Sequence, residues 1–275
     1  MKKICYISII LFLFFSSCNS SQPKEKKKAR EEDKFIELIS QRIDSINSSV
    51  SSNPIQTEKN KKKQSYYSRQ FFNIVSRYTD SIQIIKNWNG IVTNFEYKKG
   101  EKSSFIKLDI EIEYKGDNFI SYPKNKIVLR SIYTVENEMK DKDIVFNKMA
   151  EINNNANVYI VGFFNKNMNG NVSVGNNLRE FNFSILNISR SPIDFSMSSN
   201  MSEAVKCKFE EMNILGRGML NNKSEKEIKK EVLYLKNDSI RTTLNNDEIA
   251  LIDKIEKLYV LNLAREYIKK TLKKL

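Results

Sequence analysis

The chain contains no histidine, and this absence removes the commonest general base of enzymes. Without histidine there is no Ser-His-Asp or Cys-His arrangement and no histidine-ligated zinc site. The 8 glycines are scattered and form neither of the phosphate-binding motifs GxGxxG and GxxxxGK[ST]. Carboxylates gather at Asp109, Glu111 and Glu113, but their alternate spacing predicts outward charges on the solvated face of a strand. We therefore expect a protein that is not an enzyme and that holds no metal and no cofactor.

Long apolar runs are scarce as well, and the one at the N-terminus is short. It extends from Ile4 to Phe15, whereas a membrane-spanning helix needs about 20 apolar residues. A signal-peptide core of about 7–15 residues fits this length. Lys2 and Lys3 precede the run, as in the basic start of a signal peptide, and small serines follow it. We predict a signal peptide over residues 1–17.

The residues that end this run, FFSSC, resemble the lipobox of bacterial lipoproteins. Phe15 stands where leucine is usual, a departure that spirochaete-type lipoproteins tolerate. The resemblance implies cleavage before Cys18 and attachment of lipid, such as palmitate, to Cys18. The alternatives are an ordinary secretory signal with an incidental cysteine and an uncleaved anchor. Of the 3 cysteines, cleavage would leave Cys207 without an intrachain disulfide partner.

A polar, densely charged segment follows Cys18. Residues 18–30 read CNSSQPKEKKKAR and contain too little apolar surface to fold, so they predict a disordered tether behind the lipidated cysteine. The whole chain has 46 Lys+Arg against 33 Asp+Glu, a formal net charge of +13. Lysine is frequent throughout, so we do not take this excess as a sign of nucleic-acid binding.

Helical periodicity predicts helices on both sides of a central block. Residues 31–80 carry one apolar stripe with Ile36, Ile39, Ile43 and Ile46, and residues 193–275 carry another with Ile252, Ile255, Tyr259 and Ile268. Ser224 and Glu227 have the spacing of a capping box, and Asn245 is a predicted N-cap. Cys207 lies between Lys206 and Lys208, which favour a lowered thiol pKa, but no base accompanies it, so we predict a structural cysteine in a helix. We expect the C-terminal helices to pack with the N-terminal ones.

The central block, residues 81–192, alternates with the period of strands. SFIKLDIEIEY is the clearest case, with apolar residues on one side and charges on the other. The predicted order is three strands, a helix and two strands, with a bend at Trp88-x-Gly90 in the first strand. This order resembles an OB-fold. The resemblance implies an α+β protein: an OB-like five-stranded antiparallel β-barrel with an internal helix, flanked by N- and C-terminal helices. A β-sandwich or a split α+β sheet is the alternative.

OB-folds often bind nucleic acid or sugar on the face of strands two and three. Here that face would present mainly carboxylates, so we expect no nucleic-acid partner. The rim around the first hairpin offers cations and aromatic rings instead. The candidate binding patch consists of Tyr97, Lys98, Lys99, Lys102, Phe105, Tyr122, Lys124 and Lys126.

Together these features predict a lipoprotein of the bacterial outer membrane, held by its N-terminal lipid and exposed at the cell surface. Its expected role is non-catalytic binding of a host macromolecule, either a protein or an anionic glycan. The alternative is an envelope lipoprotein that faces the periplasm and has a structural or assembly role.

Overall fold

The computed structural model describes residues 30–51, 58–116, 126–232 and 242–272. The described residues from Glu31 onward belong to one compact unit. The predicted signal peptide, Cys18 and the tether up to residue 29 lie outside the described residues.

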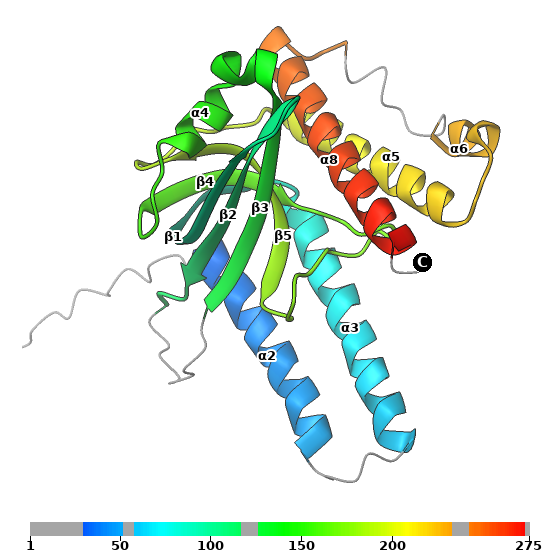
Figure 1. Cartoon of the computed structure of the whole chain (residues 1–275). Helices are drawn as coiled ribbons and strands as arrows, with labels where there is room; N and C mark the ends of the chain where they lie inside the picture. The colour runs from blue at the N-terminus through cyan, green and yellow to red at the C-terminus, as the bar shows by residue number, and fades with distance from the viewer. Residues whose placement is uncertain (1–29, 52–57, 117–125, 233–241, 273–275) are drawn as a thin grey trace, which may run out of the picture. The chain divides into compact units, whose positions relative to one another are not determined.

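Five strands close into a barrel in the order β1-β2-β3-β5-β4 (Figure 1). The strands are β1 (Ile85–Lys99), β2 (Ser103–Glu113), β3 (Lys126–Glu136), β4 (Asn157–Phe164) and β5 (Glu180–Ser189). The α+β class and the barrel are confirmed, and the closed sheet excludes the sandwich and split-sheet alternatives. The prediction of a purely antiparallel barrel is wrong, because β3 pairs with β5 in parallel. An odd number of strands cannot alternate in direction all the way around a closed ring, so one neighbouring pair must be parallel.

The first strand is shared between two partners. Its first half pairs with β4, from Ile85 to Ile91, and its second half pairs with β2, from Ile91 to Lys99. Gly90 lies near this change of partner, and a Cβ there would come within 2.7 Å of the carbonyl oxygen of Glu111. Glycine thus allows the close strand approach that a long, bent strand requires.

A helical hairpin of α2 (Glu31–Ser51) and α3 (Glu58–Ile82) covers one end of the barrel. Phe35 of α2 is fully buried there, with its ring 5.7 Å from that of Trp88 and 5.0 Å from that of Phe164. The indole N–H of Trp88 donates to a carboxylate oxygen of Glu31 at 3.1 Å. The N-terminal turns of α2 therefore close this end with an aromatic plug and a satisfied polar group.

The short helices η1 (Asn137–Lys142) and α4 (Ile144–Ala150) cover the other end, opposite α2 (Figure 1). Asp143 caps α4 by accepting a hydrogen bond from the N–H of Phe146 at 2.9 Å. Phe146 and Met149 are fully buried against the barrel interior. The helix predicted between the third and fourth strands is confirmed.

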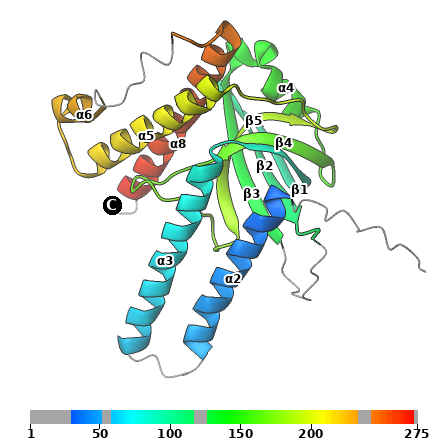
Figure 2. The same ribbon diagram turned by 180° about the vertical axis from the view of Figure 1, so that it is seen from behind.

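The C-terminal helices are α5 (Ser199–Leu220), α6 (Glu225–Val232) and α8 (Asn246–Leu272). The capping box of Ser224 with Glu227 is confirmed, and Asn245 caps α8 by accepting from the N–H of Glu248 at 2.9 Å. The main packing pairs α5 with α8 and α2 with α3, as two separate pairs (Figure 2). Among the described residues no such pairing joins an N-terminal helix to a C-terminal one, which differs from the predicted shared layer.

Helix α8 seals a seam in the barrel wall. The β3–β5 pairing covers only Val128–Arg130, so beyond Arg130 β3 has no strand partner on that side among the described residues. Arg265 of α8 donates instead to the carbonyl oxygen of Ile132 at 3.1 Å and to Oγ1 of Thr134 at 2.7 Å. On the β5 side, the ammonium of Lys254 donates to the carbonyl oxygen of Leu186 at 3.3 Å. Side chains of α8 thus replace part of the missing strand pairing.

Replacing Arg265 with methionine should lower the free energy of unfolding by about 1–3 kcal/mol, because Thr134 at the seam loses its part-buried charged donor. Arg190→Met is the matched control, since Arg190 also donates to a carbonyl oxygen but is exposed. We expect a change within about 0.5 kcal/mol for the control. Urea unfolding of both variants measures the difference. Equal losses of unfolding free energy would contradict a stabilising role for the seam hydrogen bonds of Arg265.

Candidate functional site

The structure divides the predicted binding patch between the two ends of the barrel. Tyr97, Lys98, Lys99, Lys102 and Phe105 lie on the β1–β2 hairpin, at the end that α4 covers. Lys126 pairs with Glu113 at the far end of β2, whose ten residue steps at about 3.3 Å correspond to about 33 Å. The grouping with Lys126 is therefore wrong, because an antiparallel strand begins where its neighbour ends. Tyr122 and Lys124 lie outside the described residues.

Two of the hairpin residues are held by neighbours. Lys98 forms an ion pair with Glu96 at 2.6 Å and lies 5.9 Å from the centre of the Phe105 ring. The phenol oxygen of Tyr97 accepts a hydrogen bond from the ammonium of Lys140 at 3.0 Å. This bond, with a second one involving Ser104, lowers the pKa of Tyr97. Lys99 and Lys102 remain exposed at the hairpin turn.

Helix η1 adds residues that the sequence did not predict. Lys140 reaches the hairpin through Tyr97. In the same η1–α4 segment, Met139 and Ile144 are 50% and 70% exposed and line the cleft described below. We call the combined area the barrel-end surface. It consists of Tyr97, Lys99, Lys102, Met139, Lys140 and Ile144. The sequence of η1, NEMKDK, is charged, but it has no helical or strand periodicity from which its position beside the hairpin could be predicted.

The charges on the outer face of β2 are paired, contrary to the prediction of solvated carboxylates. Asp109 is 8% exposed and accepts from Nε of Arg130 at 2.9 Å, and Arg130 also lies 3.4 Å from Glu180. Glu111 pairs with Lys126 at 2.6 Å. Cross-strand register places Asp109 directly opposite Arg130, a relationship that sequence spacing does not contain.

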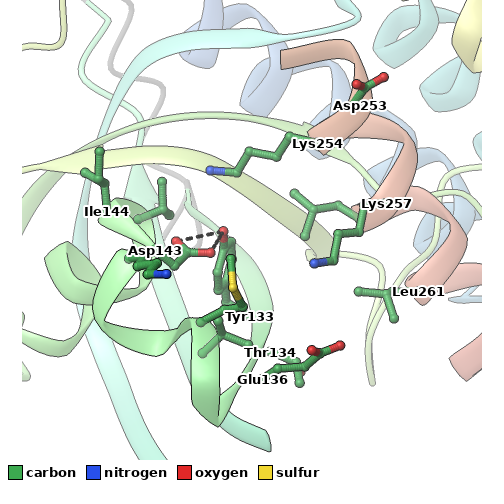
Figure 3. Close-up of a pocket in the computed structure, with 14 residues that line it drawn as sticks. Tyr133, Thr134, Glu136, Asp143, Ile144, Asp253, Lys254, Lys257 and Leu261 are labelled. Carbon is green, nitrogen blue, oxygen red and sulfur yellow. Dashed lines mark hydrogen bonds between the residues drawn. The ribbon is translucent and has the colours of Figure 1, made fainter. Parts of the chain in front are cut away.

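A cleft of about 440 Å³ lies between the end of β3, the η1–α4 segment and α8. Figure 3 shows its labelled residues, with Lys254 and Lys257 reaching from α8 toward the side that carries Asp143. Apolar side chains make up much of the remaining lining. The cleft residues used below are Tyr133, Glu136, Asp143, Val145, Lys254, Lys257, Leu258 and Leu261.

Burial shapes the chemistry of the polar groups in this cleft. The phenol of Tyr133 donates to both carboxylate oxygens of Asp143, at 3.2 and 3.0 Å. Burial, reinforced by the negative charge of Asp143, raises the pKa of Tyr133. Burial also lowers the pKa of Lys254, whose ammonium lies 5.7 Å from the centre of the Tyr133 ring. The cleft therefore combines a neutral phenol, a carboxylate already engaged by donors and an incompletely solvated ammonium.

The raised tyrosine pKa predicts a loss of stability in alkali. An unfolded tyrosine loses its proton near pH 10, whereas folded Tyr133 keeps it, so the free energy of unfolding should fall as pH rises above about 10. Tyr133→Phe should make this decline shallower without abolishing it, because buried Tyr259 also has a raised pKa. Urea unfolding at a series of pH values measures the slope. Tyr97→Phe is the contrast, since the pKa of exposed Tyr97 is lowered and its removal should not make the decline shallower.

Cys207 lies on α5, as predicted, but its lysine neighbours do not activate it. Lys208 is bound to Glu211 at 2.8 Å and to Glu256 at 3.0 Å, and Lys206 lies 4.0 Å from Glu203. Burial, with the charges of Glu203 and Glu210, raises the pKa of Cys207, so the expected lowering is wrong. A thiol with a raised pKa is a poor nucleophile at neutral pH.

Within the described ranges, no group of three or more His, Cys, Asp and Glu side chains could hold a metal ion. The same part of the chain contains no helix with the length and apolar character of a membrane span. Comparison with protein-family models found no match, and neither curated proteins nor solved structures gave one. Inference about function therefore rests on the geometry of this chain alone.

Proposed function

We propose that the protein is a lipid-anchored lipoprotein of a spirochaete-type bacterial outer membrane, and that it binds a host macromolecule at the cell surface without catalysis. The observation that carries this proposal is the barrel-end surface. Met139 and Ile144 expose apolar area beside Lys99, Lys102 and Lys140. Interaction surfaces typically combine exposed apolar side chains with a charged rim. Here these side chains lie on helices and strands that are packed against the barrel core.

We also propose that the barrel is an OB-fold. Its strand order, its single parallel pairing and the helix between β3 and β4 support this assignment. OB-folds that bind nucleic acid use cations and stacked aromatic rings on the β2–β3 face. Here Arg130 is neutralised by Asp109 and Glu180, and Lys126 by Glu111. The proposed partner is therefore not a nucleic acid, and we take an anionic glycan as the first candidate.

The anchor is tested by replacing Cys18 with alanine. Wild-type protein should incorporate labelled palmitate and partition into detergent, and Cys18→Ala should do neither, since lipid attachment requires the cysteine thiol. Label on the variant would contradict lipidation at Cys18. Proteinase K applied to intact cells then decides the orientation. Degradation of the mature protein supports surface display, and its survival supports the periplasm-facing alternative.

The binding surface is tested with heparin as the anionic glycan. Changing Lys99, Lys102 and Lys140 together to glutamate should make the protein elute at lower salt, because exposed charges act over about 8 Å at physiological ionic strength. The matched control is the same reversal at three exposed lysines of α5 and α6. The control residues are Lys206, Lys226 and Lys230. An equal shift in both triple variants would indicate nonspecific attraction and would contradict a glycan site at the barrel end.

A further inference from the structure

We propose that the cleft between β3, α4 and α8 binds a small amphiphile with a single carboxylate. The carboxylate would lie against the ammonium groups of Lys254 and Lys257, and the alkyl chain against Leu258, Leu261 and Val145. The cleft shares Met139 and Ile144 with the barrel-end surface, but the ligand proposed here and its test do not depend on the proposed macromolecule binding.

The first argument is the state of Lys254. An ammonium has three donors, and the only hydrogen bond found for Lys254 among the described residues is a long one of 3.3 Å to the carbonyl oxygen of Leu186. Among the described residues no carboxylate forms an ion pair with it within 4 Å, and the negative charge of Asp143 only partly offsets the lowering of its pKa by burial. The cation–π contact of Lys254 with the Tyr133 ring offsets the cost of burying the ammonium charge only in part, because the pKa of Lys254 is still lowered. A ligand carboxylate would supply the missing acceptor.

The second argument is the shape and lining of the cleft. Its volume of about 440 Å³ lies within the range of about 300–1,000 Å³ that small-molecule sites occupy. Such sites are mainly apolar with a few placed polar groups, and here Leu258, Leu261 and Val145 contribute the apolar walls. Figure 3 shows Lys254 and Lys257 on one helix, both directed toward the same space. An apolar chain with one charged end matches this arrangement.

The third argument concerns the charge of the ligand. Asp143 already occupies one side of the cleft, where it accepts from the Tyr133 hydroxyl and from the N–H of Phe146. Glu136 and Asp253 add two further carboxylates to the lining. A doubly charged phosphate would be repelled by these groups more than a carboxylate, which carries one charge. The cleft therefore favours a monocarboxylate.

The test is calorimetric titration of the full-length mature protein in a non-ionic detergent with hexanoate, octanoate and decanoate. Detergent alone supplies the blank. Affinity should rise about fourfold for each added CH₂ until the cleft is full. Lys254→Met should weaken octanoate binding by about tenfold or more, since it removes a charged hydrogen-bond donor. Octanol, which lacks the charge, should bind this variant and the wild type alike.

Two further variants keep the test decisive. Lys206→Met on α5 removes an exposed lysine outside the cleft and should leave octanoate binding unchanged. Leu261→Trp should fill the cleft and abolish binding of octanoate and octanol, with the melting temperature as the check on folding. Binding no stronger than the blank would overturn the proposal. Undiminished octanoate binding by a folded Leu261→Trp variant would overturn it as well.

Discussion

Replacing Phe35 with alanine should lower the free energy of unfolding by about 3–5 kcal/mol, the cost of deleting a large buried aromatic side chain. The ring is 0% exposed and lies within 5.0–5.7 Å of four other rings. These rings belong to α3, β1, β4 and β5, so Phe35 joins the helical hairpin to the barrel. Its removal would leave a cavity at the point where these elements meet.

Urea unfolding measures the loss, and Tyr66→Ala is the control. Tyr66 belongs to the same helical hairpin but is 57% exposed, so its removal should change stability by no more than about 0.5 kcal/mol. Phe35→Leu should fall between the two, because leucine fills part of the cavity. Equal stability of Phe35→Ala and Tyr66→Ala would show that the aromatic plug does not hold the barrel end.

Replacing Gly162 with alanine should cost about 3 kcal/mol or more, at the upper end of overpacking penalties. A Cβ at Gly162 would lie 2.1 Å from the carbonyl oxygen of Ser184 and 2.6 Å from the ring of Phe183. The oxygen belongs to the backbone of the neighbouring strand β5, so relief requires the strands to separate. Gly162 also pairs with Ile85 of β1, and this separation would disturb both pairings.

Gly216 provides a control with the opposite expected sign. It lies within α5, and the nearest atom to its added Cβ would be a side-chain carbon of Leu263 at 3.4 Å. Alanine favours helix over glycine by up to about 1 kcal/mol, so Gly216→Ala should be neutral or stabilising. Thermal unfolding of both variants makes the comparison. A loss at Gly216 as large as that at Gly162 would contradict the strand-contact explanation.

Much of the barrel follows from residue periodicity. The alternation of Ile106, Leu108, Ile110 and Ile112 defines β2 and its buried face, and the order of elements predicts a barrel with one internal helix. The pairing of Asp109 with Arg130 could not be predicted in the same way, because it depends on cross-strand register. The role of α8 was hidden for a related reason: Arg265 meets Ile132 across more than a hundred residues of chain.

The candidate site was predictable only where it is local in sequence. Lys99 and Lys102 lie on one hairpin, so spacing alone places them together. The contribution of Lys140 arises because β3 runs back beside β2 and ends near the hairpin turn. The cleft combines β3, the η1–α4 segment and α8, which come from separate parts of the chain. No residue pattern links Tyr133 with Lys254 until the fold brings them together.

The seam between β3 and β5 determines when the barrel can close as the chain is synthesised. Arg265, which helps to seal it, lies on α8 and is synthesised after all five barrel strands. A nascent chain can form the β1–β2–β3 meander early, but the exposed edges of β3 and β5 stay open until α8 emerges. Open strand edges are templates for aggregation, so a prematurely terminated chain should be removed by proteases or form inclusions.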